Sequence, residues 1–234
     1  IVNNGGTIIA RESVNGGTSF RRGTAIDTRF APNPVDIRFL GASNVFGNIR
    51  LGAPDTITIA SGTTTLDGII NPAGAVMEES RVAVTHTTTP LVGSLTVANG
   101  ATLFLVNQPN GNANYDGPAR VNVDSFTLAS GSTLRLQMPS ATTATAAQGS
   151  YPTITANTAT LTGANLVLQL NTPNGLYANQ YVFGDVIDAQ TRTGQFASVT
   201  TNTRSVLLAP TVAYDTANNV DITLTRVAFN AVGG

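Results

Sequence analysis

Two aspartates near the C-terminal end of the chain, Asp185 and Asp188 in the stretch GDVID, have types and spacing that suit a reaction. Glycoside hydrolysis requires a pair of carboxyl groups, one acting as an acid and the other as a base or nucleophile. The chain has 13 acidic residues, however, and most of them are spread singly along it instead of gathering in one segment. A β-rich carbohydrate-active enzyme therefore stays an alternative that the acidic residues do not favour.

The other candidates for catalysis lie in one segment. His86, in VTHTTTP, is the only histidine, and no Gly-x-Ser-x-Gly motif accompanies it, so we interpret it as a polar loop residue. A single histidine also supplies too few ligands for a zinc site. The adjacent Glu78 and Glu79 would face opposite sides of a strand, and we interpret them as solvated loop residues. The sequence thus predicts no catalytic group, cofactor or metal.

Three residues of the stretch YDTANNV, namely Asp215, Asn218 and Asn219, carry oxygen atoms that could bind calcium. Their spacing lacks the acidic density of an EF-hand, and it lacks the Gly-Gly-x-Gly-x-Asp repeat of calcium-binding β-rolls. Asparagine and aspartate also tolerate left-handed backbone and hydrogen-bond to the turn that contains them. We therefore predict a turn here.

Amide side chains and an aromatic ring are concentrated in NQPNGNANYDGPARVN, from Asn107 to Asn122, which has neither a helical nor a strand period. A second long segment without a period runs from Gln137 to Pro152. We interpret both as exposed loops. Because amides and an aromatic face suit contact with a sugar or a protein, the first loop is the best candidate for recognition. Its candidate residues are Asn110, Asn112, Asn114 and Tyr115.

Charged residues make up only 11% of the chain, whereas a typical soluble domain has about 25%. The polarity comes from neutral residues, since the chain has 35 threonines, 22 asparagines and 23 glycines. Threonine favours strands, and asparagine and glycine favour turns. The composition is therefore typical of an all-β protein with many short strands.

The 12 basic residues are all arginine, and the net charge is −1. Without a basic patch or a polybasic run, the sequence predicts neither a nucleic-acid partner nor attraction to an anionic membrane. The absence of cysteine excludes disulfides and thiolate metal sites. No apolar run reaches the roughly 18 residues of a membrane-spanning helix, so direct insertion is not expected. The first residue is Ile1, and we expect a fragment of a longer protein whose export signal or anchor lies outside it.

Two stretches repeat without gaps, LTVANGATLFL from Leu95 to Leu105 and FTLASGSTLRL from Phe126 to Leu136. In each, apolar residues alternate, a small-residue corner with glycine follows, and the alternation resumes. Looser versions run from Ile57 to Ile69 and from Ala159 to Leu170. Alternation over three to five residues indicates a strand with one buried face, and glycine permits the bend between two such strands. Each unit is thus predicted to form a strand, a corner and a second strand.

A chain that repeats this unit can coil so that each turn pairs with the turn before it, with strands about 4.8 Å apart. The sequence therefore predicts a parallel β-helix, or solenoid. An antiparallel sandwich would also have short alternating strands at regular spacing. The similarity between units, together with the shortage of two-residue hairpin signals, favours the solenoid.

The last third of the chain contains TATLTGANLVLQL, then YVFGDVIDAQTRTGQFASV, then VLLAPTVAYDTANNVDITLTR, and then AFNAVGG. This order resembles the C-terminal end of the passenger domain of classical (type Va) autotransporters, of the pertactin-like kind, over residues 158–232. The matching elements are Gly163 to Leu166, Tyr181 to Val186, Thr193 to Phe196, and a closing hairpin from Tyr214 to Arg226. The residues that carry the resemblance are Gly163, Leu166, Tyr181, Phe183, Gly194, Phe196, Tyr214, Asp215, Asn219, Val220, Leu224 and Arg226.

One residue departs from the family pattern: Asp221 stands where the family usually has tyrosine or another apolar residue. The resemblance implies that Asp185 lies at the end of a strand and Asp188 in the loop after it. It also implies a right-handed parallel β-helix over residues 1–157, followed by an autochaperone region with a β-sandwich-like or hairpin cap over residues 158–234. In that family the autochaperone folds first and assists secretion.

The resemblance further implies a non-enzymatic stem or adhesin at the surface of a Gram-negative bacterium, exported through the outer membrane. Its partner would be its own C-terminal β-barrel translocator, which would begin after AFNAVGG. A ligand on a host or neighbouring cell is a further partner that the family implies. The alternative of another class is a structural or adhesive surface protein that self-associates into a fibre or layer.

Overall fold

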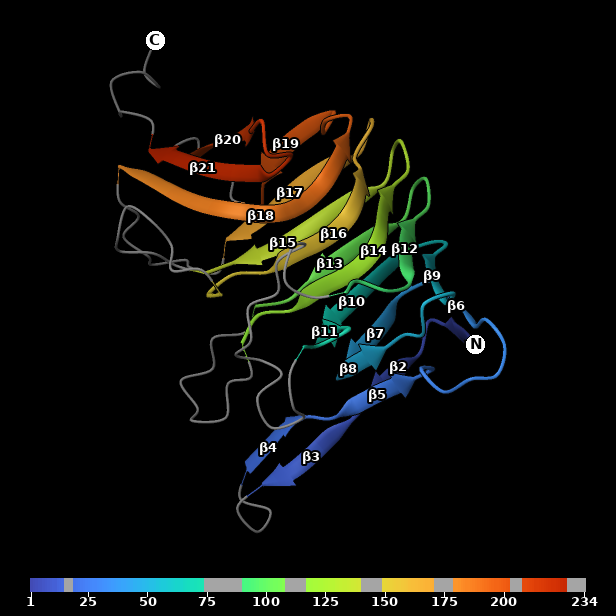
Figure 1. The fold of residues 1–234 in the computed structure, drawn as a ribbon. Helices are drawn as coiled ribbons and strands as arrows, with labels where there is room; N and C mark the ends of the chain where they lie inside the picture. The colour runs from blue at the N-terminus through green and yellow to red at the C-terminus, as the bar shows by residue number, and fades with distance from the viewer. Residues whose placement is uncertain are drawn as a thin grey trace.

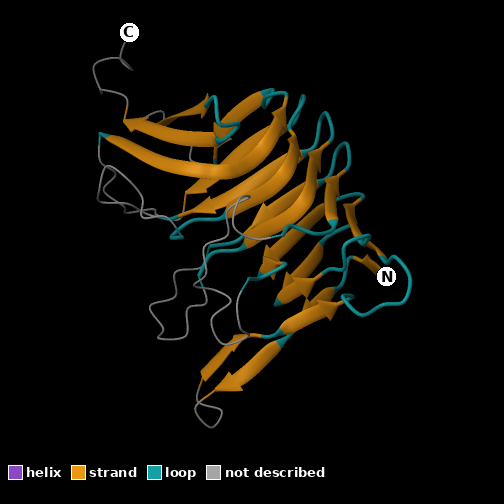
Figure 2. Cartoon of the chain, viewed as in Figure 1, coloured by secondary structure: helices purple, strands orange, loops and turns teal. Residues whose placement is uncertain are grey.

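The structure is a computed structural model that describes residues 1–14, 19–73, 90–107, 117–139, 149–170, 179–202 and 208–226. In these residues the regular structure consists of strands, without a helix (Figure 2). The described residues accordingly contain no helix of the length and hydropathy needed to cross a membrane. The expectation of an all-β chain is confirmed.

Most strands belong to two sheets (Figure 1). The larger sheet contains β1 (Val2–Asn4), β5 (Thr24–Asp27), β6 (Asp36–Leu40), β8 (Asn48–Arg50), β9 (Thr56–Ile59), β11 (Ile69–Ile70), β12 (Ser94–Val97), β14 (Arg120–Leu128), β16 (Thr153–Thr160), β18 (Gln180–Thr193), β20 (Leu208–Tyr214) and β21 (Val220–Arg226). The smaller sheet contains β2 (Thr7–Ile9), β7 (Ser43–Phe46), β10 (Thr63–Asp67), β13 (Thr102–Leu105), β15 (Thr133–Met138), β17 (Asn165–Leu170) and β19 (Ser198–Thr201). A separate antiparallel pair is formed by β3 (Arg11–Val14) and β4 (Ser19–Arg22).

The chain passes repeatedly from one sheet to the other. The strand orders are β1-β6-β9-β12-β14-β16-β18-β21-β20 in the larger sheet and β19-β17-β15-β13-β10-β7-β2 in the smaller. In the larger sheet, neighbouring strands are parallel from β1 through β6, β9, β12, β14 and β16 to β18. In the smaller sheet, all neighbouring strands from β2 to β19 are parallel. This long parallel pairing is compatible with a β-helix and argues against the antiparallel sandwich.

The larger sheet bends along its length. At its start β14 pairs with β11, and from Ser125 onward it pairs with β12, so one long strand continues two shorter ones. Asp124, at the junction, is exposed, and the strand pairing between β14 and β16 skips it: Val123 pairs with Ala156 and Ser125 with Thr158. The same junction recurs in β16 at Asn157. The larger sheet therefore forms two faces that meet at this line of residues.

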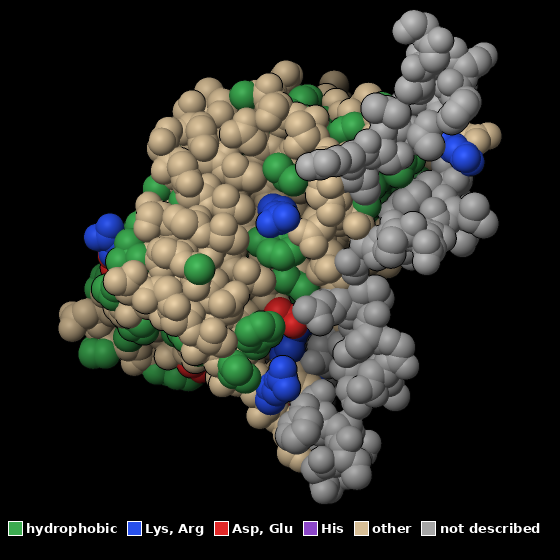
Figure 3. All heavy atoms as spheres, turned by 180° about the vertical axis from the view of Figure 1, so that it is seen from behind, with side chains coloured by type: hydrophobic (Ala, Val, Ile, Leu, Met, Phe, Trp, Pro, Cys, Tyr) green, Lys and Arg blue, Asp and Glu red, His purple; other side chains and the backbone are tan. Residues whose placement is uncertain are grey.

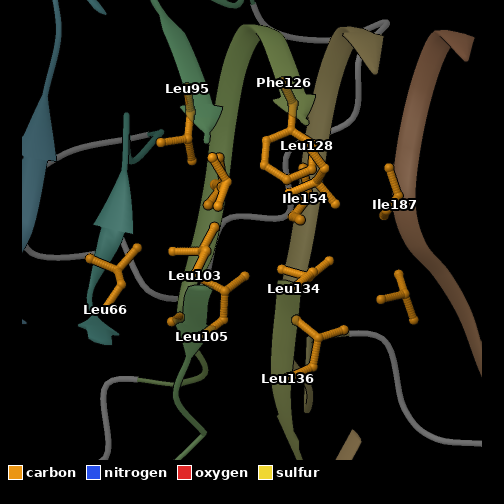
Figure 4. Packing of buried hydrophobic residues seen from close by; sticks show 14 of the residues in the cluster. Leu66, Leu95, Leu103, Leu105, Phe126, Leu128, Leu134, Leu136, Ile154 and Ile187 are labelled. Carbon is orange, nitrogen blue, oxygen red and sulfur yellow. The ribbon is translucent and has the colours of Figure 1, made fainter. Parts of the chain in front are cut away.

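The core lies between the sheets and follows the repeat that the sequence shows. Leu95 pairs with Phe126 in the larger sheet, and Leu103 pairs with Leu134 in the smaller. These four side chains are at most 1% exposed, and they point toward one another across the interior (Figure 4). The two repeated stretches are therefore stacked in register, as predicted.

The surface reflects the low proportion of charge. Viewed from behind, uncharged polar side chains and backbone cover most of the described surface, and arginine, aspartate and glutamate occur at few places (Figure 3). An ion pair links the β3–β4 hairpin to the rest of the molecule: it is formed by Arg22 of β4 and Asp67 of β10. A second ion pair, between Arg21 and Glu12 at 2.7 Å, lies within the hairpin.

Candidate functional site

The parallel sheet ends at an antiparallel hairpin of β20 and β21, called here the terminal hairpin. β21 pairs antiparallel with the first half of β18 and with β20, and Tyr214 faces Val220 across the turn. Val220, Ile222 and Leu224 of β21 are fully buried. The hairpin therefore adds apolar side chains to the core while it reverses the strand direction at the end of the sheet.

A β-bulge in β18 is built around Asp185. The register with β21 shifts between Phe183 and Ile187, and Asp185 has a φ of 50°, a left-handed value. Its N–H donates a hydrogen bond to Oδ1 of Asp221 at 2.8 Å, and its own Oδ1 accepts one from Nδ2 of Asn219 at 2.9 Å. Two side chains of the terminal hairpin thus hold the bulge.

The predicted positions of the two aspartates of GDVID are wrong. Asp185 and Asp188 both lie within β18, which continues to Thr193, and not at a strand end and in the loop after it. The physical reason is the bulge, which absorbs the irregular Gly184-Asp185 step without ending the strand. Asp221 also has a role that the sequence did not reveal, because its carboxylate turns toward the bulge instead of into solvent.

Acidic residues surround Asp185. Burial raises the pKa of the Asp185 carboxyl, the negative charges of Asp221, Asp188 and Asp215 raise it further, and the hydrogen bond from Asn219 opposes them. A raised carboxyl pKa is also a property of catalytic acids. Here the Asp185 carboxylate accepts a hydrogen bond from Asn219 of the hairpin, and the Asp221 carboxylate accepts one from the Asp185 N–H of the bulge, so their contacts account for a structural role.

The turn between β20 and β21 is held by its own polar residues. Asp215 Oδ1 accepts a hydrogen bond from the Asn219 N–H at 2.7 Å, and the Asp215 N–H donates to the Asn219 carbonyl at 3.2 Å. Asn218 has a φ of 70°, and its Nδ2 donates to the Gln190 carbonyl at 2.9 Å. The predicted turn with left-handed asparagine is confirmed. Within the described residues, no three or more histidine, cysteine, aspartate or glutamate side chains are grouped to hold a metal ion.

Three aromatic rings pack beneath the terminal hairpin. Tyr181 contacts Phe183 edge-to-face with ring centroids 4.7 Å apart, and Tyr151 contacts the same ring at 5.3 Å. The Tyr151 hydroxyl donates to the Gly184 carbonyl at 2.6 Å. Burial, and next the charges of Asp185 and Asp221, raise the pKa of Tyr151 to about 12. Sequence reasoning missed Tyr151 because it lies within the segment from Gln137 to Pro152, which has no period and, from the sequence alone, is interpreted as an exposed loop.

Tyr214 connects the terminal hairpin to the turn after β18. Its Oη accepts a hydrogen bond from the Phe196 N–H at 2.9 Å. The guanidinium of Arg192 lies over the Tyr214 ring at 4.7 Å, and Phe196 packs partly buried against the core. Tyr214 and Phe196, which the sequence placed in separate elements, are therefore in direct contact.

Gly163 and Gly194 occupy successive corners where the chain leaves the larger sheet. Both have left-handed φ values, 74° and 77°. A Cβ on Gly194 would lie 2.1 Å from Oγ1 of Thr162, and one on Gly163 would lie 2.6 Å from Oγ of Ser130. Glycine is thus required at these corners by both conformation and space.

The remaining candidate residues are placed as follows. Leu166 is buried in β17, and the buried Leu224 pairs with Tyr181 near the start of β18. Arg226 is exposed at the end of β21, where its N–H donates to the Asn179 carbonyl at 2.8 Å. Leu166 is therefore a core residue of the parallel sheet and not part of the hairpin.

Several predicted residues lie outside the described residues: Glu78, Glu79, His86, the four loop residues Asn110, Asn112, Asn114 and Tyr115, and the stretch AFNAVGG. A scan against protein-family models finds no match, and a search of curated proteins finds no similar sequence. The interpretation of the terminal hairpin therefore rests on its geometry and on the motifs of the sequence.

Proposed function

We propose that the chain is a right-handed parallel β-helix that forms the membrane-proximal end of an autotransporter passenger domain. In this proposal it is a non-enzymatic stem at the surface of a Gram-negative bacterium, and its C-terminal part assists folding and secretion. The two long parallel sheets support the fold. The motifs between residues 158 and 226 support the family, and the family supplies the partner, a downstream β-barrel translocator.

The observation that carries the proposal is the way the terminal hairpin ends the larger sheet. The edge of a parallel sheet exposes unpaired N–H and C=O groups, which are a template for aggregation. β21 pairs with β18 over five residue pairs and buries three apolar side chains there. Its outer neighbour β20 carries Pro210, which lacks an N–H donor. The hairpin thus covers the sheet and leaves an edge that is poorly suited to a further strand.

A hairpin of this kind suits a role in folding. In a parallel repeat each strand gains its partner from the strand before it, and the first pairing is the most costly because non-local contacts must close a loop. The β20–β21 pair joins strands separated by a short turn, so it can form with little loop-closure cost. Once formed, it offers β21 as a partner for β18, from which the parallel pairing can extend.

Refolding kinetics test the role of the hairpin. Phe196→Ser removes an apolar contact beside Tyr214, and Val45→Ala shortens a side chain that is 1% exposed in β7. If the C-terminal region forms first, Phe196→Ser slows refolding from urea, whereas Val45→Ala mainly speeds unfolding. The proposal would be contradicted if both variants divided their loss of stability in the same way between slower refolding and faster unfolding.

Surface display tests the role in secretion. The chain would be produced between a signal peptide and an outer-membrane barrel, and the displayed fraction measured with a surface label. Phe196→Ser and Tyr214→Ser are expected to lower display. The control is Phe30→Ser, because Phe30 is 85% exposed and its loss leaves the core intact. Unchanged display of both Phe196→Ser and Tyr214→Ser would refute the secretion role.

A second function, self-association into a fibre or layer, is favoured by the opposite end of the molecule. β1 and β2 are the outermost strands there, and the described large hydrophobic residues that are exposed all fall within the first 30 positions: Ile1, Val2, Ile9 and Phe30. β1 and β2 carry no charged residue that would oppose contact between two copies.

Sedimentation and electron microscopy test this second function. Self-association through β2 predicts concentration-dependent oligomers that Ile9→Lys abolishes. Thr211→Lys, on the exposed surface of β20, is the matched control and leaves them intact. If the chain stays monomeric at all concentrations, self-association is refuted, and the proposed role as an autotransporter stem is unaffected.

A further inference from the structure

Two columns of hydroxyl side chains run across the outer surface of the larger sheet. Thr58 of β9 pairs with Thr96 of β12, Thr96 with Thr127 of β14, Thr127 with Thr160 of β16, and Thr160 with Thr193 of β18. Two residues earlier on each strand stands a second column. We call the ten residues the hydroxyl array: Thr56, Thr58, Ser94, Thr96, Ser125, Thr127, Thr158, Thr160, Thr191 and Thr193.

The array is more uniform than the composition alone explains. The chain has 35 threonines and 13 serines among 234 residues, about one residue in five, yet all ten positions are threonine or serine. The smaller sheet provides the comparison. Its outer surface is less uniform: one column contains Thr65, Phe104, Arg135, Val167 and Thr200 in register, and the other contains Thr63, Thr102, Thr133, Asn165 and Ser198. A general preference for threonine in strands would act on both sheets, so it does not explain the difference.

The geometry of the array is set by the backbone. Adjacent strands are about 4.8 Å apart, and residues two apart along a strand are separated by roughly 6.6 Å. The array therefore presents hydroxyl groups on a two-dimensional lattice. None of the ten side chains is in the buried class. Threonine is restricted at χ1, so ordering this surface against a partner costs little further conformational entropy.

The chemistry of the array limits the class of partner that it can bind. Each hydroxyl donates one hydrogen bond and accepts two, as water does, and the array contains no charged or aromatic residue. A neutral lattice matches an uncharged and ordered partner, whereas sugar-binding surfaces commonly use aromatic rings. Charged residues border the array: Thr56 Oγ1 donates to Oδ1 of Asp36 at 2.9 Å, Arg38 stands in register with Thr58, and the exposed Asp124 precedes Ser125.

We propose that the hydroxyl array binds the ordered water lattice of ice. Waters held by successive hydroxyls repeat at the spacing of the strands, and they join the protein to a crystal face through many simultaneous weak contacts. Liquid water offers no fixed lattice, so the contacts add up only at the crystal. This binding does not depend on the proposed folding role, since it uses β9, β12 and the C-terminal ends of β14, β16 and β18.

Partition into slowly growing ice tests the proposal. The full chain carries a fluorescent label, and its fraction in the ice is compared with that of albumin. The wild-type chain is expected to enter the ice. Thr127→Lys, at the centre of the array, loses this partition because a strongly hydrated ammonium group interrupts the lattice. Thr158→Lys, at an exposed position, provides a second variant if Thr127→Lys does not fold.

The matched control is Thr133→Lys on the outer surface of the smaller sheet, in the same register as Thr102. It keeps the partition into ice, and circular dichroism checks the fold of all variants. Exclusion of the wild-type chain from ice would overturn the proposal. So would equal losses in Thr158→Lys and Thr133→Lys, or binding to crystalline cellulose in place of ice.

Discussion

Replacing Gly194 by alanine tests how closely the corners of successive repeats approach one another. Gly194 follows β18, and a Cβ there would lie 2.1 Å from Oγ1 and 2.8 Å from Cα of Thr162. Gly100 is the matched control. Its φ of 73° is close to the 77° of Gly194, but a Cβ at Gly100 would meet no atom within 4 Å.

The two substitutions share one cost and differ in another. Left-handed backbone costs a residue with a Cβ about 1–2 kcal/mol, and the smaller entropy of the unfolded alanine chain returns roughly 0.5 kcal/mol. Gly100→Ala is therefore expected to lose about 1 kcal/mol of unfolding free energy. At Gly194 the overlap with Thr162 adds an overpacking cost of about 1–3 kcal/mol, so the total loss is about 3 kcal/mol.

Urea unfolding followed by circular dichroism measures both losses. The cost of the overlap is measured separately with Thr162→Ala, which removes the Oγ1 atom nearest to the new Cβ. Because the Thr162 side chain is exposed, this substitution alone should change stability little. In the Gly194→Ala background, Thr162→Ala should restore part of the lost stability, whereas in the Gly100→Ala background it should not. Equal losses at the two glycines, or no restoration, would refute the close approach of the corners.

Three further substitutions probe single polar groups. Thr64→Val should raise the unfolding free energy by about 1 kcal/mol, because the Thr64 Oγ1 is buried without a hydrogen-bond partner beside a small apolar cavity; a loss in urea unfolding would contradict this. Asp185→Asn keeps an acceptor for Asn219 and tolerates left-handed backbone. The pKa of Asp185 is raised in the folded state, so the ionised carboxylate opposes folding: this cost is absent below the unfolded pKa and complete above the folded pKa. The variant should thus be more stable at neutral pH and equal to wild type in acid, as thermal melts between about pH 3 and pH 7 would show; a wild type whose relative stability does not fall across this range would contradict it. Tyr214→Phe should cost about 1 kcal/mol and speed hydrogen exchange of the Phe196 amide, since that N–H loses its acceptor; unchanged exchange would mean that water replaces the hydroxyl fully.

The repeat and its register could be predicted from local patterns. Alternating apolar residues and a corner glycine recur in LTVANGATLFL and FTLASGSTLRL, and the structure stacks Leu95 on Phe126 and Leu103 on Leu134. The turn of Asp215 to Asn219 could be predicted for the same reason, because its hydrogen bonds connect residues four apart. Interactions between residues close in the sequence can be predicted from a short stretch of it.

The contacts that organise the region around the terminal hairpin could not be predicted in this way. Tyr151 reaches Gly184 across 33 residues, and Asp221 reaches Asp185 across 36. Arg192 stands at an alternating position where an apolar residue is expected; its guanidinium lies over the Tyr214 ring and donates to the Gly194 carbonyl. The bulge at Asp185 likewise depends on partners that β21 supplies.

The position of β21 also has a mechanical consequence. β21 lies between β18 and β20 and runs antiparallel to both, so a force that acts along it from Arg226 loads both sets of interstrand hydrogen bonds in shear. Shear requires many bonds to break together, whereas strands peeled apart lose their bonds one at a time. Tension at the C-terminal end would therefore meet its greatest resistance at the place where the parallel sheet stops.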